Sequence, residues 1–509
     1  MRLPAAHLGH AVAHAHAERV GDEKFAHASL LRHVASVPPR YAERVAETEA
    51  GRARRAVTIV GGAIGLAQRL SAALDERTQS WFWLDGAAAA PGEPPVSYLG
   101  IAAELAVPVA GRPHEFLERI SGATGPAAGD AAGFCAGWVA ALGYEFGEAL
   151  LGLDPTPDTA PAALALRADV VIAVAGERGE LRAGSQASID EWLTRYGALL
   201  SEGAPGDEPR MAARPTHATR AADARASGAP QTGRWRHDDP SYEAAVEACK
   251  SAIREGEAYV LCLTDTLSLA TRARPLDVFL RLRERAGALR GGLIVTPGRA
   301  LVSASPERFL SVRGARVATH PIKGTRPRGD SPAADEQLAA ELQRDPKERA
   351  ENLMIVDLMR NDLSRVCAPE SVAVSGFLRV EQHPHVHQLV STVSGTLRPG
   401  QQTSQVIAAC FPGGSMTGAP KRRAVEILRG LEAGPRGLYA GCFGWLDADG
   451  DAELAMTIRG VEFRGTGALR EARIGAGGGI TADSRAATEL AEKHLKAAAL
   501  LSALDTVNE

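Results

Sequence analysis

The segment GAGGGITADS (residues 475–484) separates two classes of fold. Gly477, Gly479 and Ala482 have the spacing of a dinucleotide-binding fingerprint, which would place the chain among doubly wound α/β proteins. That fingerprint needs a following helix and a second parallel strand, because a strand–helix–strand unit forms the binding crevice. Only one helix fits between this segment and Glu509. We therefore expect a fold outside the nucleotide-binding α/β class.

A second glycine-rich segment, FPGGSMTGAPKRRAVEIL (residues 411–428), has the look of a phosphate-binding loop. Ala419 and Pro420 separate Gly418 from Lys421, so the Gly–Lys step that such a loop requires is broken. Both glycine segments run into helical patterns, where free backbone N–H groups and the helix dipole favour a carboxylate. Tight turns explain the same glycines equally well, so both interpretations stay open.

The patterns around these segments indicate an α+β organisation. SWFWLDG, PVSYLG and ADVVIAVAGERGELRAG are typical of short strands, and IDEWLTRYGALL is typical of a helix. Residues 202–234 have almost no large apolar side chains, as in a flexible linker. Beyond it, SYEAAVEACKSAIREG predicts a helix and EAYVLCLTDTLSLA predicts a strand. We predict an extension of unknown role at 1–55, an α+β domain at 56–201, the linker, and a second domain at 235–509.

Composition excludes several function classes. The chain has 509 residues, 45% of them hydrophobic and 23% charged, which is enough for one large core or two to three smaller ones. Its formal net charge of −4 gives no basic field for nucleic acid. Six cysteines occur singly, without a metal or disulfide pattern. No apolar run is long enough to span a membrane, so we expect a cytoplasmic protein without a membrane or nucleic-acid partner.

Histidines are frequent near the N-terminus, and two of them would share one face of a helix. No carboxylate or cysteine completes a metal site there, so we favour a solvated helix with incidental histidines over a metal site. The residues concerned are His7, His10, His14 and His16.

Two pairs of glutamates have the spacing that places both members on one helix face. Glu348 and Glu351 lie in DPKERAENLMIVDLMRNDLSRV, and Glu489 and Glu492 lie in SRAATELAEKHLKAAALL. Two facing carboxylate pairs would suit Mg²⁺, which takes a few protein oxygens and leaves positions for water and an anionic ligand. Glutamates at this spacing are more often a solvated surface, and the spacing alone does not decide.

The loop THPIKGTRPRG (residues 319–329) places one lysine ahead of two arginines. Lys323 could act as a nucleophile only if its pKa were lowered, and we expect Arg326, Arg328 and a nearby Mg²⁺ to lower it. SASPERFL offers Glu307 as a general acid at the end of a predicted strand. The alternative is an exposed cationic loop.

Five segments occur in the order known from one family: SPERFL, PIKGTRPRG, ERAENLMIVDLMRNDLSRV, FPGGSMTGAPKRRAVEIL and GGGITADS. Together they resemble the chorismate-utilising enzymes over about residues 235–505, with a weaker match through FWLDG, PVSYLG and GFCAGWVAALGYEFG. The resemblance implies an α+β fold in which two antiparallel-sheet domains pack as a β-sandwich flanked by helices, with chorismate bound by residues 235–509.

Within this family, the loop sequence PIKGT resembles that of the aminodeoxychorismate synthases. Anthranilate synthases have a sequence similar to PIAGT at the same place. The resemblance implies that Lys323 is a covalent nucleophile and that Glu307 is the general acid. Chorismate would be aminated at C4 to 4-amino-4-deoxychorismate, towards 4-aminobenzoate. The ammonia would come from solution or from a separate glutamine amidotransferase, since no amidotransferase pattern is visible in the chain.

The same resemblance assigns the remaining site residues. Glu351 and Glu492 would bind Mg²⁺, with Glu348 and Glu489 close by, and the metal would hold the ring carboxylate of chorismate. Tyr439 and Arg459 would contact the enolpyruvyl carboxylate. The other expected substrate-binding residues are Thr417, Gly477, Gly478 and Lys496.

Some positions depart from the family pattern. Gln388 stands where anthranilate synthases have a histidine linked to pyruvate elimination, which agrees with retention of the enolpyruvyl group. Val260 replaces the lysine of members that use water, and the Gln or Glu of many ammonia users. WLDG (residues 83–86) replaces the tryptophan-inhibition motif, so feedback by tryptophan is not expected. The alternatives are an anthranilate synthase component I and a catalytically idle chorismate-binding subunit.

Overall fold

A computed structural model of the protein describes residues 52–86, 95–122, 133–201, 233–286, 290–383 and 386–504, and the backbone of 46–47. The predictions for the N-terminal histidines and for nearly all of the linker lie outside these residues. All the described elements belong to one unit, Val45–Glu509. All six cysteines are buried free thiols, and within the described ranges no helix is long and apolar enough to cross a membrane.

The larger sheet is antiparallel throughout and draws its strands from both halves of the chain. At its centre β3 pairs with β12 in the register Trp83↔Leu293. Its strands, in spatial order, are β1 (Ala46–Glu47), β2 (Ala53–Thr58), β9 (Arg178–Ala183), β8 (Val170–Ala175), β4 (Ser97–Ile101), β3 (Trp81–Asp85), β12 (Arg290–Thr296), β13 (Arg299–Ser305), β22 (Gly460–Arg464), β23 (Arg470–Ile480), β11 (Val260–Thr271) and β10 (Arg234–Trp235), with β19 (Gly418–Ala419) also on β11.

The second sheet is likewise antiparallel and likewise shared. Here β6, from the first half, pairs with β20, from the second, in the register Leu142↔Cys442. The order is β16 (Ile322–Pro327), β18 (Val386–Thr396), β15 (Arg316–His320), β14 (Arg308–Arg313), β21 (Ala452–Met456), β20 (Cys442–Asp447), β6 (Gly137–Leu142), β7 (Ala163–Ala168) and β5 (Glu104–Ala106), with β17 (Ala373–Gln382) also on β18.

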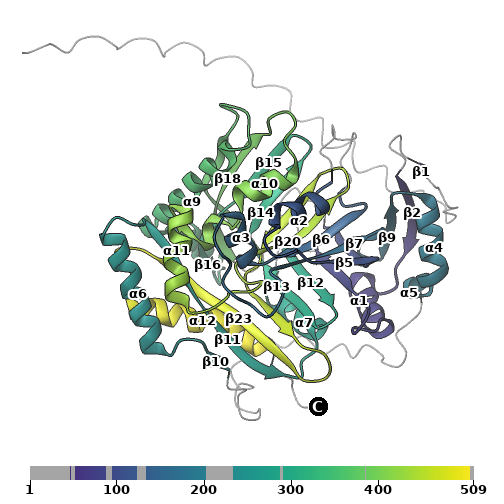
Figure 1. The fold of residues 1–509 in the computed structure, drawn as a ribbon, viewed down its shortest axis with the longest axis horizontal. Helices are drawn as coiled ribbons and strands as arrows, with labels where there is room; N and C mark the ends of the chain where they lie inside the picture. The colour runs from purple at the N-terminus through teal and green to yellow at the C-terminus, as the bar shows by residue number, and fades with distance from the viewer. Residues whose placement is uncertain are drawn as a thin grey trace, which may run out of the picture. The chain divides into compact units, whose positions relative to one another are not determined.

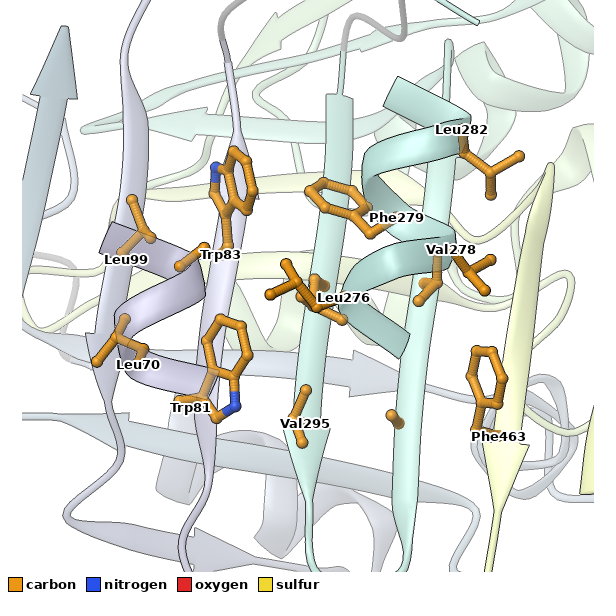
Figure 2. Close-up of a cluster of buried hydrophobic side chains, with 14 of the residues drawn as sticks. Leu70, Trp81, Trp83, Leu99, Leu276, Val278, Phe279, Leu282, Val295 and Phe463 are labelled. Atoms are coloured by element: carbon orange, nitrogen blue, oxygen red, sulfur yellow. The ribbon is translucent and has the colours of Figure 1, made fainter. Parts of the chain in front are cut away.

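The central strands are buried on both faces, which explains their continuous apolar runs. In β3, Trp81 and Trp83 point to one cluster of buried side chains, whereas Phe82 and Leu84 point to another. Successive side chains of a strand alternate between faces, so the second cluster lies between the two sheets and the first lies under helices. Figure 2 shows the first cluster, where the Phe279 and Trp83 rings meet edge-on with their centroids 4.9 Å apart.

Helices cover the outer faces of this sandwich (Figure 1). The larger sheet is covered by α1 (Gly62–Ala73), α4 (Gln186–Tyr196), α7 (Pro275–Ala286) and α12 (Ala486–Leu504). The second sheet is covered by α2 (Pro113–Ile120), α3 (Tyr144–Leu150), α9 (Pro346–Ser364) and α10 (Thr403–Cys410). Two further helices, α6 (Asp239–Arg254) and α11 (Lys421–Glu432), pack on β11, and α8 (Pro332–Arg344) packs on β16 and β18. The predicted α+β sandwich is confirmed.

The segment GAGGGITADS is not a loop that leads into a helix, and that part of the prediction was wrong. Gly475 to Ile480 are the end of strand β23, and α12 begins only at Ala486. A Cβ atom at Gly477 would lie 2.1 Å from the backbone oxygen of Leu263 on β11. Gly477 therefore permits close approach of two strands and does not expose helix N–H groups.

Candidate active site

Helices α9 and α12 carry the two predicted glutamate pairs near their N-terminal ends. Helix α9 begins after Asp345, whose side chain accepts hydrogen bonds from the backbone N–H groups of Lys347 and Glu348. Glu489 lies in the first turn of α12. The positive end of a helix dipole favours carboxylates in the first turn, so both helices can hold these side chains ionised close to other acids.

Strand β23 brings the two pairs together. A Cβ at Gly478 would lie 3.0 Å from Oε2 of Glu489 and 3.7 Å from Oε1 of Glu492. A Cβ at the next residue, Gly479, would lie 3.9 Å from Oε2 of Glu351. The absence of side chains at these two glycines leaves the space into which the carboxylates point.

The four carboxylates differ in their charge environment. Burial raises the pKa of Glu348, and the neighbouring acids Glu351 and Asp345 add to it. Burial also raises the pKa of Glu489, against a hydrogen bond of 2.8 Å from Ser484.

At Glu492, burial is outweighed by nearby lysines, chiefly Lys496, so its pKa is lowered. The Lys496 ammonium lies 2.7 Å from Oε1 of Glu492 and donates to the Gly477 carbonyl at 2.7 Å. Lys496 therefore ties α12 to β23 beside the carboxylates.

Lys323 lies on β16 and faces the carboxylates. Its Nζ is 3.8 Å from Oε2 of Glu351 and 3.9 Å from the Cβ position at Gly479. Burial pulls the pKa of Lys323 down, but the acids around it, above all Glu351 and then Glu307 and Glu348, outweigh burial and raise it. In this arrangement Lys323 is an ammonium group.

The two arginines of the same loop do not lower that pKa, and this expectation was wrong. Arg326 binds Asp345 at 2.8 Å and contacts Glu348 at 3.7 Å. Arg328 forms a two-pronged pair with Asp335, at 2.7 and 2.6 Å. Each guanidinium charge is thus offset by an acid of its own.

Glu307 follows β13, at the strand end that the sequence predicted, and it is buried. Its Oε1 accepts a hydrogen bond of 2.7 Å from the Ser415 hydroxyl. Burial raises the pKa of Glu307 to about 7, against the opposing effects of Ser415, Lys323 and Arg459. A carboxyl group with this pKa can hold a proton at neutral pH and give it up.

The predicted substrate contacts take different positions. Arg459 lies between β21 and β22 with a left-handed backbone (φ 49°), and its exposed guanidinium has no hydrogen bond or ion pair with the described part of the chain. The Tyr439 ring covers Gly475, where a Cβ would lie 2.1 Å from it. By contrast, the buried Thr417 hydroxyl bonds the carbonyls of its own turn, Gly413 and Gly414, at 3.2 and 3.4 Å.

The departures from the family pattern also have defined places. Gln388 is buried on β18, and the adjacent His387 is fully buried with Nε2 2.8 Å from Asp335. Val260 is buried at the start of β11, where its Cγ2 lies 3.7 Å from the Cβ position at Gly479. An apolar group thus lies within reach of the same space as the carboxylates and Lys323.

Sequence analysis missed two residues of this region. Ser415 was passed over because its segment was examined for its glycines and for Thr417, yet its hydroxyl bonds the carboxyl group of Glu307. Lys347 lies 3.8 Å from Oε1 of Glu351 and also lowers the pKa of Glu492. Its position one residue before Glu348 was the available signal, since a cation on the same helix turn as an acidic pair affects that pair.

The donor set fits Mg²⁺ in chemical kind. Among the described residues, no three His, Cys, Asp or Glu side chains already form a metal-binding cluster. Mg²⁺ usually takes one or two carboxylates and completes its octahedron with water and a substrate group. The carboxylates of Glu348, Glu351, Glu489 and Glu492 are oxygen ligands of the kind that Mg²⁺ takes, and burial raises the pKa of Glu348 and of Glu489.

Comparison with known proteins identifies the class to which this fold and site belong. Residues 100–502 match the model of the chorismate binding enzyme family, and the chain belongs to this family. It is 36% identical over 456 residues to an aminodeoxychorismate synthase from Streptomyces pristinaespiralis, which covers 83% of this chain and 61% of that protein. It is 44% identical over 280 residues to an anthranilate synthase component 1 from Arthrobacter globiformis, which covers 54% of this chain and 51% of that protein.

The chain therefore spans 61% and 51% of the lengths of these two curated relatives. Its fold is similar to that of anthranilate synthase component I from Streptococcus pneumoniae, with a TM-score of 0.66 over 96% of this chain and 100% of that one. At 24% sequence identity, this likeness concerns the fold.

Proposed function

We propose that the chain is the chorismate-aminating component of an aminodeoxychorismate synthase, which converts chorismate and ammonia to 4-amino-4-deoxychorismate. The observation that carries the proposal is the place of Lys323, whose amino group faces Glu351 and is coupled by charge to Glu307. An amine beside a carboxyl group with a pKa of about 7 combines a nucleophile with a proton donor.

The chemistry divides into two displacements. Neutral Lys323 attacks C2 of chorismate, both ring double bonds shift, and the C4 hydroxyl leaves as water with the proton of Glu307. Ammonia then adds at C4, both double bonds shift back, and the lysine leaves C2 as a neutral amine. The second displacement places the new amino group at C4, and the enolpyruvyl group is retained.

The side chains proposed to orient the substrate are those of Arg459 and Tyr439. The guanidinium of Arg459 can bind a carboxylate through two hydrogen bonds. Tyr439, whose ring lies against Gly475 of β23, is proposed as a second contact. The left-handed backbone at Arg459 supports this role, because strained non-glycine residues persist mainly where function requires them. Thr417, Gly477, Gly478 and Lys496 remain proposed as lining residues.

Mg²⁺ is the proposed cofactor, with Glu351 and Glu492 as ligands and Glu348 and Glu489 close by. When bound, it would supply positive charge for the ring carboxylate of chorismate. The charge state of Lys323 supports this proposal, because Glu351 holds Lys323 as an ammonium group. Once Glu351 is otherwise engaged, the burial of Lys323 favours the neutral amine that attack requires.

Ammonia is proposed to come from a separate glutamine amidotransferase. This proposal follows from the expected need for ammonia and from the sequence given, in which no amidotransferase pattern is visible. Free ammonium ions should support turnover in its absence.

A second candidate is an anthranilate synthase component I, which the 44% identity to the protein from Arthrobacter globiformis favours. Lys323 and Gln388 weigh against it. The third possibility, an idle chorismate-binding subunit, is motivated by Val260 and opposed by the intact set of Lys323, Glu307 and the four glutamates.

The test is chorismate turnover with ammonium and Mg²⁺, with 4-amino-4-deoxychorismate and anthranilate resolved by chromatography. Wild type should form the C4-aminated product, and Lys323→Ala should abolish it. Arg326→Ala is the matched control, since it removes a cation of the same strand that is paired with Asp345. Anthranilate as product, or equal activity in the Lys323 variant, would exclude the proposal.

A further inference from the structure

Ser415 lies in a short 3₁₀ turn, Gly414–Met416, and its side chain reaches the carboxyl group of Glu307. Its hydroxyl donates to Oε1 of Glu307 over 2.7 Å, and both residues are buried, at 8% and 7% exposed. Within the described chain this is the one side-chain hydrogen bond to the Glu307 carboxyl group. The contact joins residues 108 positions apart, so the fold and not the local chain creates it.

Packing holds the turn that carries Ser415 in place. A Cβ at Gly413 would lie 2.7 Å from the Met456 sulfur, and one at Gly414 would lie 2.4 Å from Cδ2 of Leu358. The turn is thus closely packed between β21 and α9. A donor on such a rigid support fixes its partner more precisely than a donor on a mobile loop.

The other charged groups that act on Glu307 are Lys323 on β16 and Arg459 after β21. Both are cations that attract the carboxylate, and neither forms a hydrogen bond with it in the described structure. Without Ser415, the Glu307 carboxyl group could turn toward either cation. With Oε1 engaged by Ser415, Oε2 is the oxygen left to carry and release a proton.

We infer that Ser415 is a positioning residue that fixes the Glu307 carboxyl group with Oε2 facing the substrate. The inference rests on the proposed function, in which Glu307 is the general acid. It goes further in assigning a role to a residue that itself touches no reacting atom. Because the hydroxyl donates its hydrogen bond, it also favours the ionised form of Glu307 over the protonated form.

The first test does not depend on turnover. Infrared difference spectra over a pH series follow the carboxylic-acid band of Glu307, which Glu307→Gln identifies by its loss. In Ser415→Ala the midpoint should rise by about one unit or more, since a hydrogen bond to a charged group is lost. Ser305→Ala is the matched control: Ser305 is buried and bonds only the Glu307 backbone, at 3.3 and 3.4 Å, so the midpoint should not move.

The second test uses the enzyme reaction. Ser415→Ala should lower kcat about ten- to a hundred-fold, leave KM for chorismate nearly unchanged and move the alkaline limb of the pH profile upward. Ser415→Thr, which restores a hydroxyl, should recover most of kcat. If Ser415→Ala does not fold, Ser415→Cys supplies a weaker donor and should give an intermediate midpoint.

An infrared midpoint that is the same in wild type and Ser415→Ala would overturn the inference, whatever the reaction. Failure of the proposed function has a different signature: Glu307→Gln would then retain chorismate turnover, or wild type would show none, while the infrared shift in Ser415→Ala still appeared.

Discussion

Glu307 illustrates, at the scale of one residue, how burial of an acidic group lowers stability. Its pKa rises from 4.5 to about 7 because the folded protein buries it. A raised acid pKa stabilises the fold fully below the unfolded pKa, and that contribution is lost as pH rises through the folded value. Between these two pH values, folding therefore becomes less favourable.

The prediction concerns Glu307→Gln, which has no proton to lose and keeps an acceptor for Ser415. Above about pH 7 its free energy of unfolding should exceed that of wild type by up to about 3 kcal/mol, whereas near pH 4 the difference should vanish. Urea unfolding at the two pH values measures this. The same variant should lose chorismate turnover, and a stability difference independent of pH would refute the buried-acid assignment.

At Lys323 the neighbouring acids stabilise the charged form of the side chain, whereas at Glu307 burial destabilises the charged form. Glu351 holds the pKa of Lys323 up, so Glu351→Gln should lower that pKa and make the amine more reactive. We expect faster modification of Lys323 by an amine-specific reagent at about pH 8, followed by peptide mass mapping. Glu341→Gln is the control, because Glu341 pairs with Arg326. Equal rates in all three proteins would contradict the role of Glu351.

Residue identities in this site could be predicted from sequence, but their charge states could not. The loop order Lys323, Arg326, Arg328 suggested three cations acting together. In the structure, Arg328 pairs with Asp335 at the start of α8, and Arg326 pairs with Asp345 at the N-cap of α9. Spacing along a chain says which side chains share a strand face, whereas the acids that meet them come from elsewhere in the fold.

At the scale of elements, two glycines of strand β23 have different surroundings. Gly477 lies against the backbone of β11, where a Cβ would be 2.1 Å from an oxygen, whereas a Cβ at Gly479 would have only ordinary contacts. Gly477→Ala should therefore cost about 3 kcal/mol or more in the free energy of unfolding.

Gly479→Ala should fold normally but weaken chorismate binding about tenfold, because its methyl group enters the space between Glu351 and Lys323. Thermal unfolding and ligand titration of the two variants check this pair of predictions. A destabilised Gly479→Ala with normal binding would show that the space is structural.

Because the glutamates of α9 and α12 lie close together, we predict that Mg²⁺ stabilises the folded protein. Mg²⁺ at about a hundred times its dissociation constant should raise the free energy of unfolding by about 2.7 kcal/mol, and Glu492→Gln should abolish most of this. Lys347→Gln removes a cation 3.8 Å from Glu351 and should tighten Mg²⁺ binding about two- to five-fold.

Calorimetric titration measures these affinities, with Arg360→Gln, on the same helix but paired with Asp357, as the control. Loss of Mg²⁺ binding in Lys347→Gln would mean that Lys347 supports the site rather than competes for it.

Helical spacing predicted each glutamate pair, yet spacing could not predict that the pairs meet. Glu351 and Glu489 lie on helices that cover different sheets of the sandwich, and β23 places them around one space. The glycines of β23 were interpreted as an anion-binding helix start or as tight turns, whereas glycine inside a strand also marks close approach of another backbone. Their actual cause, close approach of β11 on one side and of carboxylates on the other, is visible only in three dimensions.

At the scale of the whole molecule, both sheets cross the predicted boundary between residues 56–201 and 235–509. The apolar runs of β3 and β6 predicted strands, and their burial on two faces follows from the sandwich. What the runs could not indicate is the partner strand. Since β3 pairs with β12 and β6 with β20, the division into two domains stays a proposal about chain segments.

This pairing predicts that residues 235–509 do not fold alone. Without the first half, β12 and β20 become open edges, and side chains such as Leu293 and Phe443 lose the strands that cover them. Open apolar edges promote aggregation. Expressed alone, the fragment should be aggregated or lack cooperative unfolding, whereas co-expression with residues 1–201 should restore a soluble complex that binds chorismate. A monomeric fragment that unfolds cooperatively at the temperature of the full chain would show that residues 235–509 are an independent domain and that the shared sheets contribute little to its stability.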